Sequence, residues 1–263
     1  MPRLLGGVVC PLIAITLCAG CGSQNTSGSS KAATAQCEAA PIPTAVSDAS
    51  DVELIIAAGS SIPRGSWVAY KRMATQVASC LRPGARLDIH AITASSFSTP
   101  PLFSSSMPQS DGSNANPLLL RERRRAFADA VSMAIDSLPK ENVGGKADPI
   151  GALKVAADEL SDRPRAGNRI IVAIFSGWQQ APPINMYAYH IDPRNLIRLS
   201  VYRLTAAGEM PRLSGTVVDI YGISAGAMGL GDMYLQEMCG YWMAIIRAGG
   251  GTLRHCSASA APS

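Results

Sequence analysis

Residues 168–175 read Asn-Arg-Ile-Ile-Val-Ala-Ile-Phe, and this stretch decides the fold class. Its last six residues are all apolar, without the alternation of a strand that has one face in water. A continuous apolar run of this length predicts a strand buried on both faces. Ser176, Gly177 and Trp178 follow at once and end the strand. Such a strand belongs in a parallel sheet that carries helices on both sides.

Strands and amphipathic helices alternate on either side of this stretch. Further strands are predicted at 52–58, 85–94, 216–223 and 251–256. Helices are predicted, from apolar residues three and four positions apart, at 63–81, 117–138, 148–160, 194–199 and 232–248. Asp148 and Pro149 open the third helix as its N-cap and first residue. The Ser- and Pro-rich segment 95–116 is expected to be a polar loop. The order predicts an α/β fold, a single mostly parallel sheet flanked by helices on both faces.

The N-terminus has the pattern of an export signal. Arg3 precedes an apolar stretch at 4–19, and residues 17–21 read Leu-Cys-Ala-Gly-Cys before the chain turns polar. This stretch resembles the bacterial lipobox, with Cys18 where Leu is usual. The resemblance implies cleavage before Cys21, lipid on the thiol of Cys21, and a place on the extracytoplasmic face of a cell membrane. The alternatives are a secretory signal cut near Ala19 or an uncleaved anchor, although a spanning helix needs ~20 apolar residues.

The expected organisation has four parts. Residues 1–20 are the signal peptide, and 21–50, rich in small and polar residues, form a flexible linker. Residues 51–256 form one domain, and 257–263 a disordered tail. The net charge of +4 is too small to indicate a nucleic-acid partner. The basic run 121–125 is interpreted as a solvated helix face, with an anionic lipid or polymer as the alternative.

The cysteines that remain after export indicate disulfides. Four are left once the signal and the acylated Cys21 are set aside: Cys37, Cys80, Cys239 and Cys256. An even number in an oxidising compartment favours disulfides, and the sequence leaves three pairings open. The inferred layout brings Cys37 near Cys80, and Cys239 near Cys256. Among these four cysteines no Cys-x-x-Cys spacing and no Cys/His cluster supports a metal site.

The domain resembles a von Willebrand factor type A domain. The features that carry the resemblance are distributed: the Ser/Gly turn after the first strand, the helix opening at 148–153 with Asp-Pro-Ile-Gly-Ala-Leu, and the turns after 170–174 and 217–221. Such domains usually bind a divalent cation at the carboxyl ends of the strands. The matching positions here are Ala57, Gly59, Ser61, Ala147 and Ser176. Only Ser61 keeps its ligand type, and a hard cation needs at least one carboxylate. We therefore expect no metal at this site, and no cofactor.

A catalytic alternative comes from residues 222–226, Gly-Ile-Ser-Ala-Gly, which match a nucleophile elbow with Ser224 as the nucleophile. Asp232 and His255 follow in the order of a triad. A helix should start directly after Ser224, but 225–231 holds three glycines and no helical period. Asp232 is better explained as the N-cap of the last helix, and the serine hydrolase remains the alternative to a non-enzymatic function.

The expected function is binding of a protein or an envelope component at the carboxyl ends of the strands, where parallel sheets present ligand surfaces. The candidate binding rim consists of Ser60, Ser61, Asp148, Ser176, Trp178 and Ser224. Trp178 has two interpretations there, an interaction anchor or a plug that fills the space of a metal site. His90 is expected on the opposite face from Ile89 and Ala91, as a packed or surface histidine.

Overall fold

A computed structural model of the chain describes residues 44–57, 62, 64–109, 116–138, 146–163, 167–186, 193–223 and 232–258. Within these ranges the chain forms a six-stranded sheet in the order β3-β2-β1-β4-β5-β6. The strands are β1 (Ala49–Ala57), β2 (Arg86–Ile92), β3 (Phe103–Ser106), β4 (Asn168–Ile174), β5 (Thr216–Tyr221) and β6 (Thr252–Cys256). Neighbouring strands run parallel, except that the edge strand β3 is antiparallel to β2.

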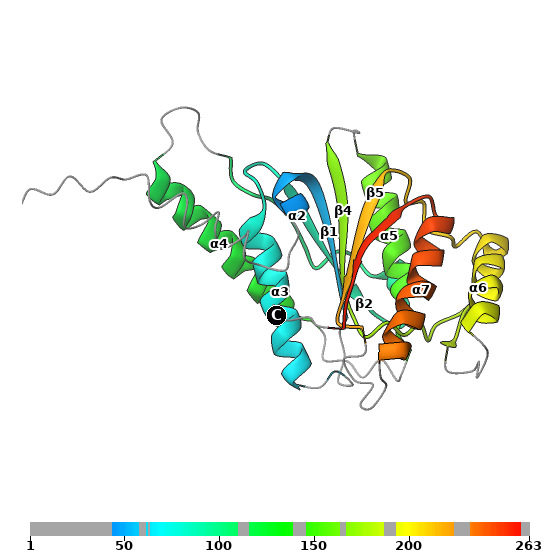
Figure 1. Cartoon of the computed structure of the whole chain (residues 1–263). Coiled ribbons are helices and arrows are strands. Elements are labelled where there is room, and N and C mark those ends of the chain that lie inside the picture. The colour runs from blue at the N-terminus through cyan, green and yellow to red at the C-terminus, as the bar shows by residue number, and fades with distance from the viewer. Residues whose placement is uncertain are drawn as a thin grey trace, which may run out of the picture.

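Helices cover both faces of this sheet (Figure 1). The helices of the described ranges are α2 (Thr44–Asp48), α3 (Arg64–Cys80), α4 (Pro117–Asp136), α5 (Pro149–Asp162), α6 (Pro193–Ala207) and α7 (Asp232–Ala248). Helices α3 and α4 lie on one side, and α5, α6 and α7 on the other. The prediction of an α/β fold with a mostly parallel, doubly covered sheet is confirmed.

The side chains of β4 are divided between two hydrophobic cores, one on each face of the sheet. Ile170, Val172 and Ile174 pack with the residues of α3 and α4, whereas Ile171 and Ala173 pack with those of α5 and α7. All five are at most 1% exposed. Because both faces of β4 are dry, its sequence has no polar alternation.

Two expectations about segments without regular structure are wrong. The loop expected at 95–116 contains β3, where Phe103 packs edge-on against Phe127 of α4 with ring centroids 5.5 Å apart. The linker expected up to residue 50 ends earlier, because residues 44–48 form α2 and Ala49 begins β1. Val46 and Ala49 are fully buried, so this stretch belongs to the core.

The remaining boundaries differ by a few residues, except for α6, which runs well beyond the expected 194–199. None of the described helices is long and apolar enough to cross a membrane. Cys239 of α7 and Cys256 of β6 form a disulfide, with Cα atoms 5.9 Å apart. Cys80 is disulfide-bonded as well, and Cys37, its expected partner, lies outside the described residues.

Candidate functional site

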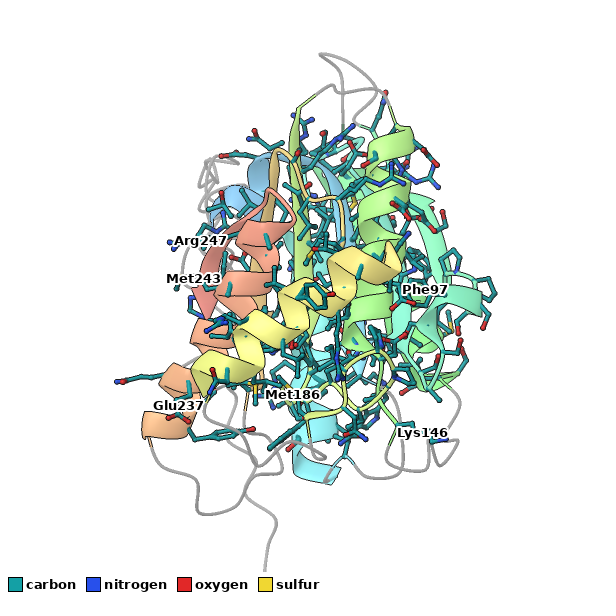
Figure 2. The ribbon with its side chains drawn as sticks, turned by 90° about the vertical axis from the view of Figure 1, so that its right-hand side faces the viewer. Phe97, Lys146, Met186, Glu237, Met243 and Arg247 are labelled. Atoms are coloured by element: carbon teal, nitrogen blue, oxygen red, sulfur yellow. A yellow bond between two sulfur atoms is a disulfide. The ribbon has the colours of Figure 1, made fainter. Side chains whose placement is uncertain are left out.

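The carboxyl ends of β2 and β4 meet the start of α5, which is the described part of the candidate rim. The Asp148 backbone N–H donates to the carbonyl of Thr93, just after β2, and Gln180 N–H donates to the carbonyl of Ala147, at 2.9 and 2.8 Å. Figure 2 shows this end of the molecule at the bottom, marked by Lys146, Met186 and Glu237. The sheet therefore places Asp148 where the sequence predicted it.

Asp148 is the N-cap of α5, as predicted. Its Oδ1 accepts from the N–H of Gly151 at 2.9 Å and from Nε2 of Gln179 at 3.0 Å. The residue is 3% exposed, and burial raises the pKa of its carboxyl against the opposing hydrogen bonds. Two hydrogen bonds therefore hold Oδ1 of this carboxyl within the protein.

Gln179, which the sequence argument missed, fills the interior beside Asp148. Its Nε2 also donates to the carbonyl of Ala181 at 2.9 Å, and its Oε1 accepts from the N–H of Ile150 at 3.0 Å. The side chain is fully buried. The side-chain amide of Gln179 thus pairs with a free backbone N–H and the N-cap at the start of α5, and so holds the loop after β4 against that helix.

Trp178 is half-buried beside this polar contact. Its ring lies 5.7 Å from the ring of Tyr234 in α7, between centroids, and packs against the core under α5 and α7. The neighbouring carbonyl of Gly177 accepts from Nε1 of the buried Trp242 at 2.9 Å. Trp178 thus fills space below the rim with part of its surface and leaves part exposed, so both interpretations from the sequence stay open.

Ser176 is the other described member of the rim, half-buried at the end of β4. Ser60, Ser61 and Ser224 lie outside the described residues, as does Cys21, the predicted lipidation site. His255, the base in the hydrolase alternative, places its ring 4.7 Å from that of Tyr221, between centroids.

A second group of polar side chains lies at the other end of α5, between the helix and the sheet. We call it the buried charge cluster, and it consists of Glu53, Asp88, His90, Glu159 and Arg163. The parallel register of β1 and β2 pairs Glu53 with Asp88 and places His90 two residues further along β2. Glu159 and Arg163 come from the last turn of α5 and its C-cap. The distance from Asp148 to Glu159 along the helix is roughly 16 Å, so the cluster is separate from the rim.

Arg163 is the centre of the cluster. Its Nη1 lies 2.8 Å from Oε1 of Glu53, and its Nη2 contacts Asp88 and lies 3.3 Å from Oε2 of Glu159. The other oxygen of Glu53, Oε2, lies 2.8 Å from Nε2 of His90. Glu53 and Asp88 are fully buried, and the Arg163 side chain is 15% exposed. One guanidinium therefore holds two carboxylates that have no access to water.

The two buried carboxyls respond differently to this setting. Burial raises the pKa of Glu53 to about 7, although His90 and Arg163 oppose the shift. Burial also favours a higher pKa for Asp88, but the hydrogen bond from Arg86 and the charge of Arg163 outweigh it, so the pKa of Asp88 is lowered. Asp88 therefore stays ionised at neutral pH, and Glu53 is the group that exchanges a proton near neutral pH.

This cluster was not predicted from the sequence, although His90 does lie on the face opposite Ile89 and Ala91, as expected. Among the described residues, Glu53, His90 and Glu159 form the one set that offers three metal-ligand atoms close together, all within 4.8 Å of one another. A signal was present in the sequence: charged or imidazole side chains at 53, 88 and 90 interrupt otherwise apolar strands. The partner from α5 had no comparable signal.

Comparisons with known proteins assign no family. No protein-family model matches the chain, and no curated protein matches its sequence. Among solved structures, the conserved hypothetical protein BatB from Bacteroides thetaiotaomicron matches with 11% identity and a TM-score of 0.39, over 80% of this chain and 91% of that one.

Two further structures are larger proteins. Proximal thread matrix protein 1 from the mussel byssus matches with 11% identity and a TM-score of 0.38, over 73% of this chain and 39% of that one. The pilus adhesin SpaC from Lactobacillus rhamnosus GG matches with 11% identity and a TM-score of 0.43, over 81% of this chain and 28% of that one. The chain thus spans well under half of the length of these two proteins.

Proposed function

We propose that this chain is an exported lipoprotein, held on the extracytoplasmic face of a membrane by lipid on Cys21. Its α/β domain binds a protein or another envelope component and catalyses no reaction. The N-terminal sequence supports the first part, since a charged start, an apolar stretch and Ala-Gly-Cys at 19–21 form a lipobox-like pattern. Helices on both faces of a mostly parallel sheet are compatible with the von Willebrand factor type A-like identity that the sequence suggests.

The observation that carries the binding function is the aromatic pair at the end of β4. Trp178 and Tyr234 are both half-buried, with their ring planes at 33° to each other. Open parallel sheets present ligands at the carboxyl ends of their strands. Tryptophan and tyrosine that keep part of their surface exposed there are the residue types that dominate protein interfaces. We infer that the partner packs on this pair.

Binding at this rim is proposed to need no cation. The described carboxylate there, Asp148, gives its Oδ1 to two hydrogen bonds and serves as the N-cap of α5. A cation on Oδ1 would compete with these bonds, which hold both the helix start and Gln179. The rim therefore supports a contact made by apolar and hydrogen-bonding groups.

Crosslinking in the native envelope tests this proposal. Full-length chain, carrying its lipid, is treated with a short crosslinker as wild type, as Trp178→Ala and as the matched control Trp67→Ala, whose tryptophan lies on α3 across the sheet. We expect an adduct that Trp178→Ala abolishes and that Trp67→Ala and EDTA leave intact. An adduct that survives Trp178→Ala, or that EDTA abolishes, contradicts the proposal. Labelling of Ser224 by a fluorophosphonate probe would show a serine hydrolase instead.

A further inference from the structure

The buried charge cluster contains a set of metal-ligand atoms that is independent of the rim. Nε2 of His90 lies 2.8 Å from Oε2 of Glu53 and 3.7 Å from Oε2 of Glu159. Zinc bonds to imidazole nitrogen and carboxylate oxygen are about 2.0–2.2 Å long, which puts neighbouring ligands of a tetrahedral ion about 3.4 Å apart. The two observed separations lie on either side of that value. Since the three side chains come from β1, β2 and α5, the fold itself brings them together.

The charge of the surroundings favours a cation. Four carboxylates lie in or beside the cluster, and two guanidiniums face them: Asp51, Glu53, Asp88 and Glu159, with Arg86 and Arg163. With all four carboxyls ionised, their charge exceeds that of the two guanidiniums by two, and a proton on Glu53, whose pKa burial raises to about 7, lowers this excess to one. A divalent cation supplies that charge. Arg163 holds the other oxygen of Glu53 and leaves Oε2 facing His90. Its Nη2 also lies 3.3 Å from Oε2 of Glu159, so an ion would share that oxygen with the guanidinium.

The hydrogen bonding of the cluster is incomplete. The side chains of Glu53 and His90 are 0% and 4% exposed. Even so, Oε1 of Glu53, Nη1 of Arg163 and Nδ1 of His90 have no hydrogen bond among the described residues. The first two atoms face each other at 2.8 Å as an ion pair without hydrogen-bond alignment. Glu53 is hydrogen-bonded through Oε2 to His90, so the atoms without a hydrogen bond are its Oε1, Nη1 of Arg163 and Nδ1 of His90. Buried polar atoms are nearly always hydrogen-bonded, so this cluster is short of partners.

We propose that Glu53, His90 and Glu159 bind a divalent transition-metal ion, with Zn²⁺ the best match. Magnesium and calcium take oxygen ligands, whereas an imidazole nitrogen beside carboxylates suits zinc. Glu159 is 31% exposed, which gives the ion a way in and leaves a coordination position open to water. The ion ties the end of α5 to β1 and β2. This site does not depend on the function proposed for the rim.

Zinc titration of the full-length chain in mild detergent tests the site, by calorimetry and by thermal melts with Zn²⁺ or EDTA. Wild type is expected to bind one Zn²⁺ and to melt higher with zinc than with EDTA. Glu159→Gln, at a partly exposed position, is expected to weaken binding at least about tenfold, the lower end of what losing even an outer-shell partner costs. His90→Gln is expected to weaken it as much.

The control is Glu237→Gln, the same change at an exposed residue of α7 near the rim (Figure 2). It is expected to bind zinc like wild type. The proposal is overturned if wild type shows neither binding heat nor a shift in melting temperature, or if Glu159→Gln binds zinc as tightly as Glu237→Gln does. In the second case the bound zinc lies elsewhere on the chain.

Discussion

Replacing Arg163 by methionine tests the buried charge cluster most severely. The substitution keeps an unbranched apolar side chain next to the end of α5 and removes the guanidinium. Two carboxylates with no exposure, Glu53 and Asp88, then lose the cation that faces them. Asp88 keeps Arg86, which donates to it at 3.0 Å, whereas Glu53 keeps only His90.

The size of the effect follows from burial. Removing one partner of a buried ion pair costs about 3–5 kcal/mol, because a charge is left without compensation in a dry environment. Glu53 escapes part of this by taking up a proton, since burial raises its pKa to about 7. We therefore expect about 3 kcal/mol near pH 7, and a smaller loss near pH 5, where Glu53 is already neutral. In a domain of this size, 3 kcal/mol lowers the melting temperature by about 6–12 °C.

Urea unfolding followed by circular dichroism, with EDTA throughout, measures the loss. The control is Arg125→Met, because the Arg125 side chain is 85% exposed and lies 4.0 Å from Asp129. Exposed pairs of this kind contribute about 0–1 kcal/mol. If Arg163→Met and Arg125→Met unfold at the same urea concentration, the cluster does not hold α5 to the sheet and the reasoning is wrong.

Three further predictions concern stability. Burial raises the pKa of Glu53 above its unfolded value, so the stability that this residue contributes is complete at acid pH and is lost as the pH rises through about 7. Glu53→Gln should therefore remove about 2 kcal/mol of the decline in unfolding free energy that wild type shows between pH 5 and 8 in EDTA. Equal pH profiles for both chains contradict this. The disulfide of Cys239 and Cys256 closes a 17-residue separation, so replacing both by alanine should cost about 3 kcal/mol in chemical unfolding; a loss below about 1 kcal/mol argues that the cross-link is unimportant. Asp148→Ala should cost about 1–2 kcal/mol by removing the N-cap of α5, and hydrogen exchange should show the first turn of α5 opening more often, whereas unchanged exchange there argues against the cap.

The sheet could be predicted from the sequence because its central strands are dry on both faces. Residues 170–175 are apolar without alternation, and the structure places them between two cores. Strand β3 could not be predicted in the same way. Phe103 is its sole apolar residue, and three serines follow it. An edge strand exposes most of its side chains, so its position depends on pairing with β2, which the local sequence does not encode.

The buried charge cluster marks a different limit. Glu53, Asp88 and His90 interrupt apolar strands, and their facing one side of the sheet follows from the alternation of side chains. Their meeting requires the register of β1 on β2, which pairs Glu53 with Asp88. Arg163 and Glu159 join only because α5 runs back over these two strands. Tertiary geometry of this kind has no signature in the spacing of residues along the chain.

The most direct test of the central claim is the intact mass of the chain isolated from bacterial membranes, with sequencing of its first peptide. An anchored lipoprotein predicts a chain that begins at Cys21 and carries the mass of a diacylglyceryl group on that residue. Cys21→Ser should abolish the added mass and release the protein from the membrane fraction. A chain that begins near residue 20 without added mass, or that keeps residues 1–20, contradicts the claim.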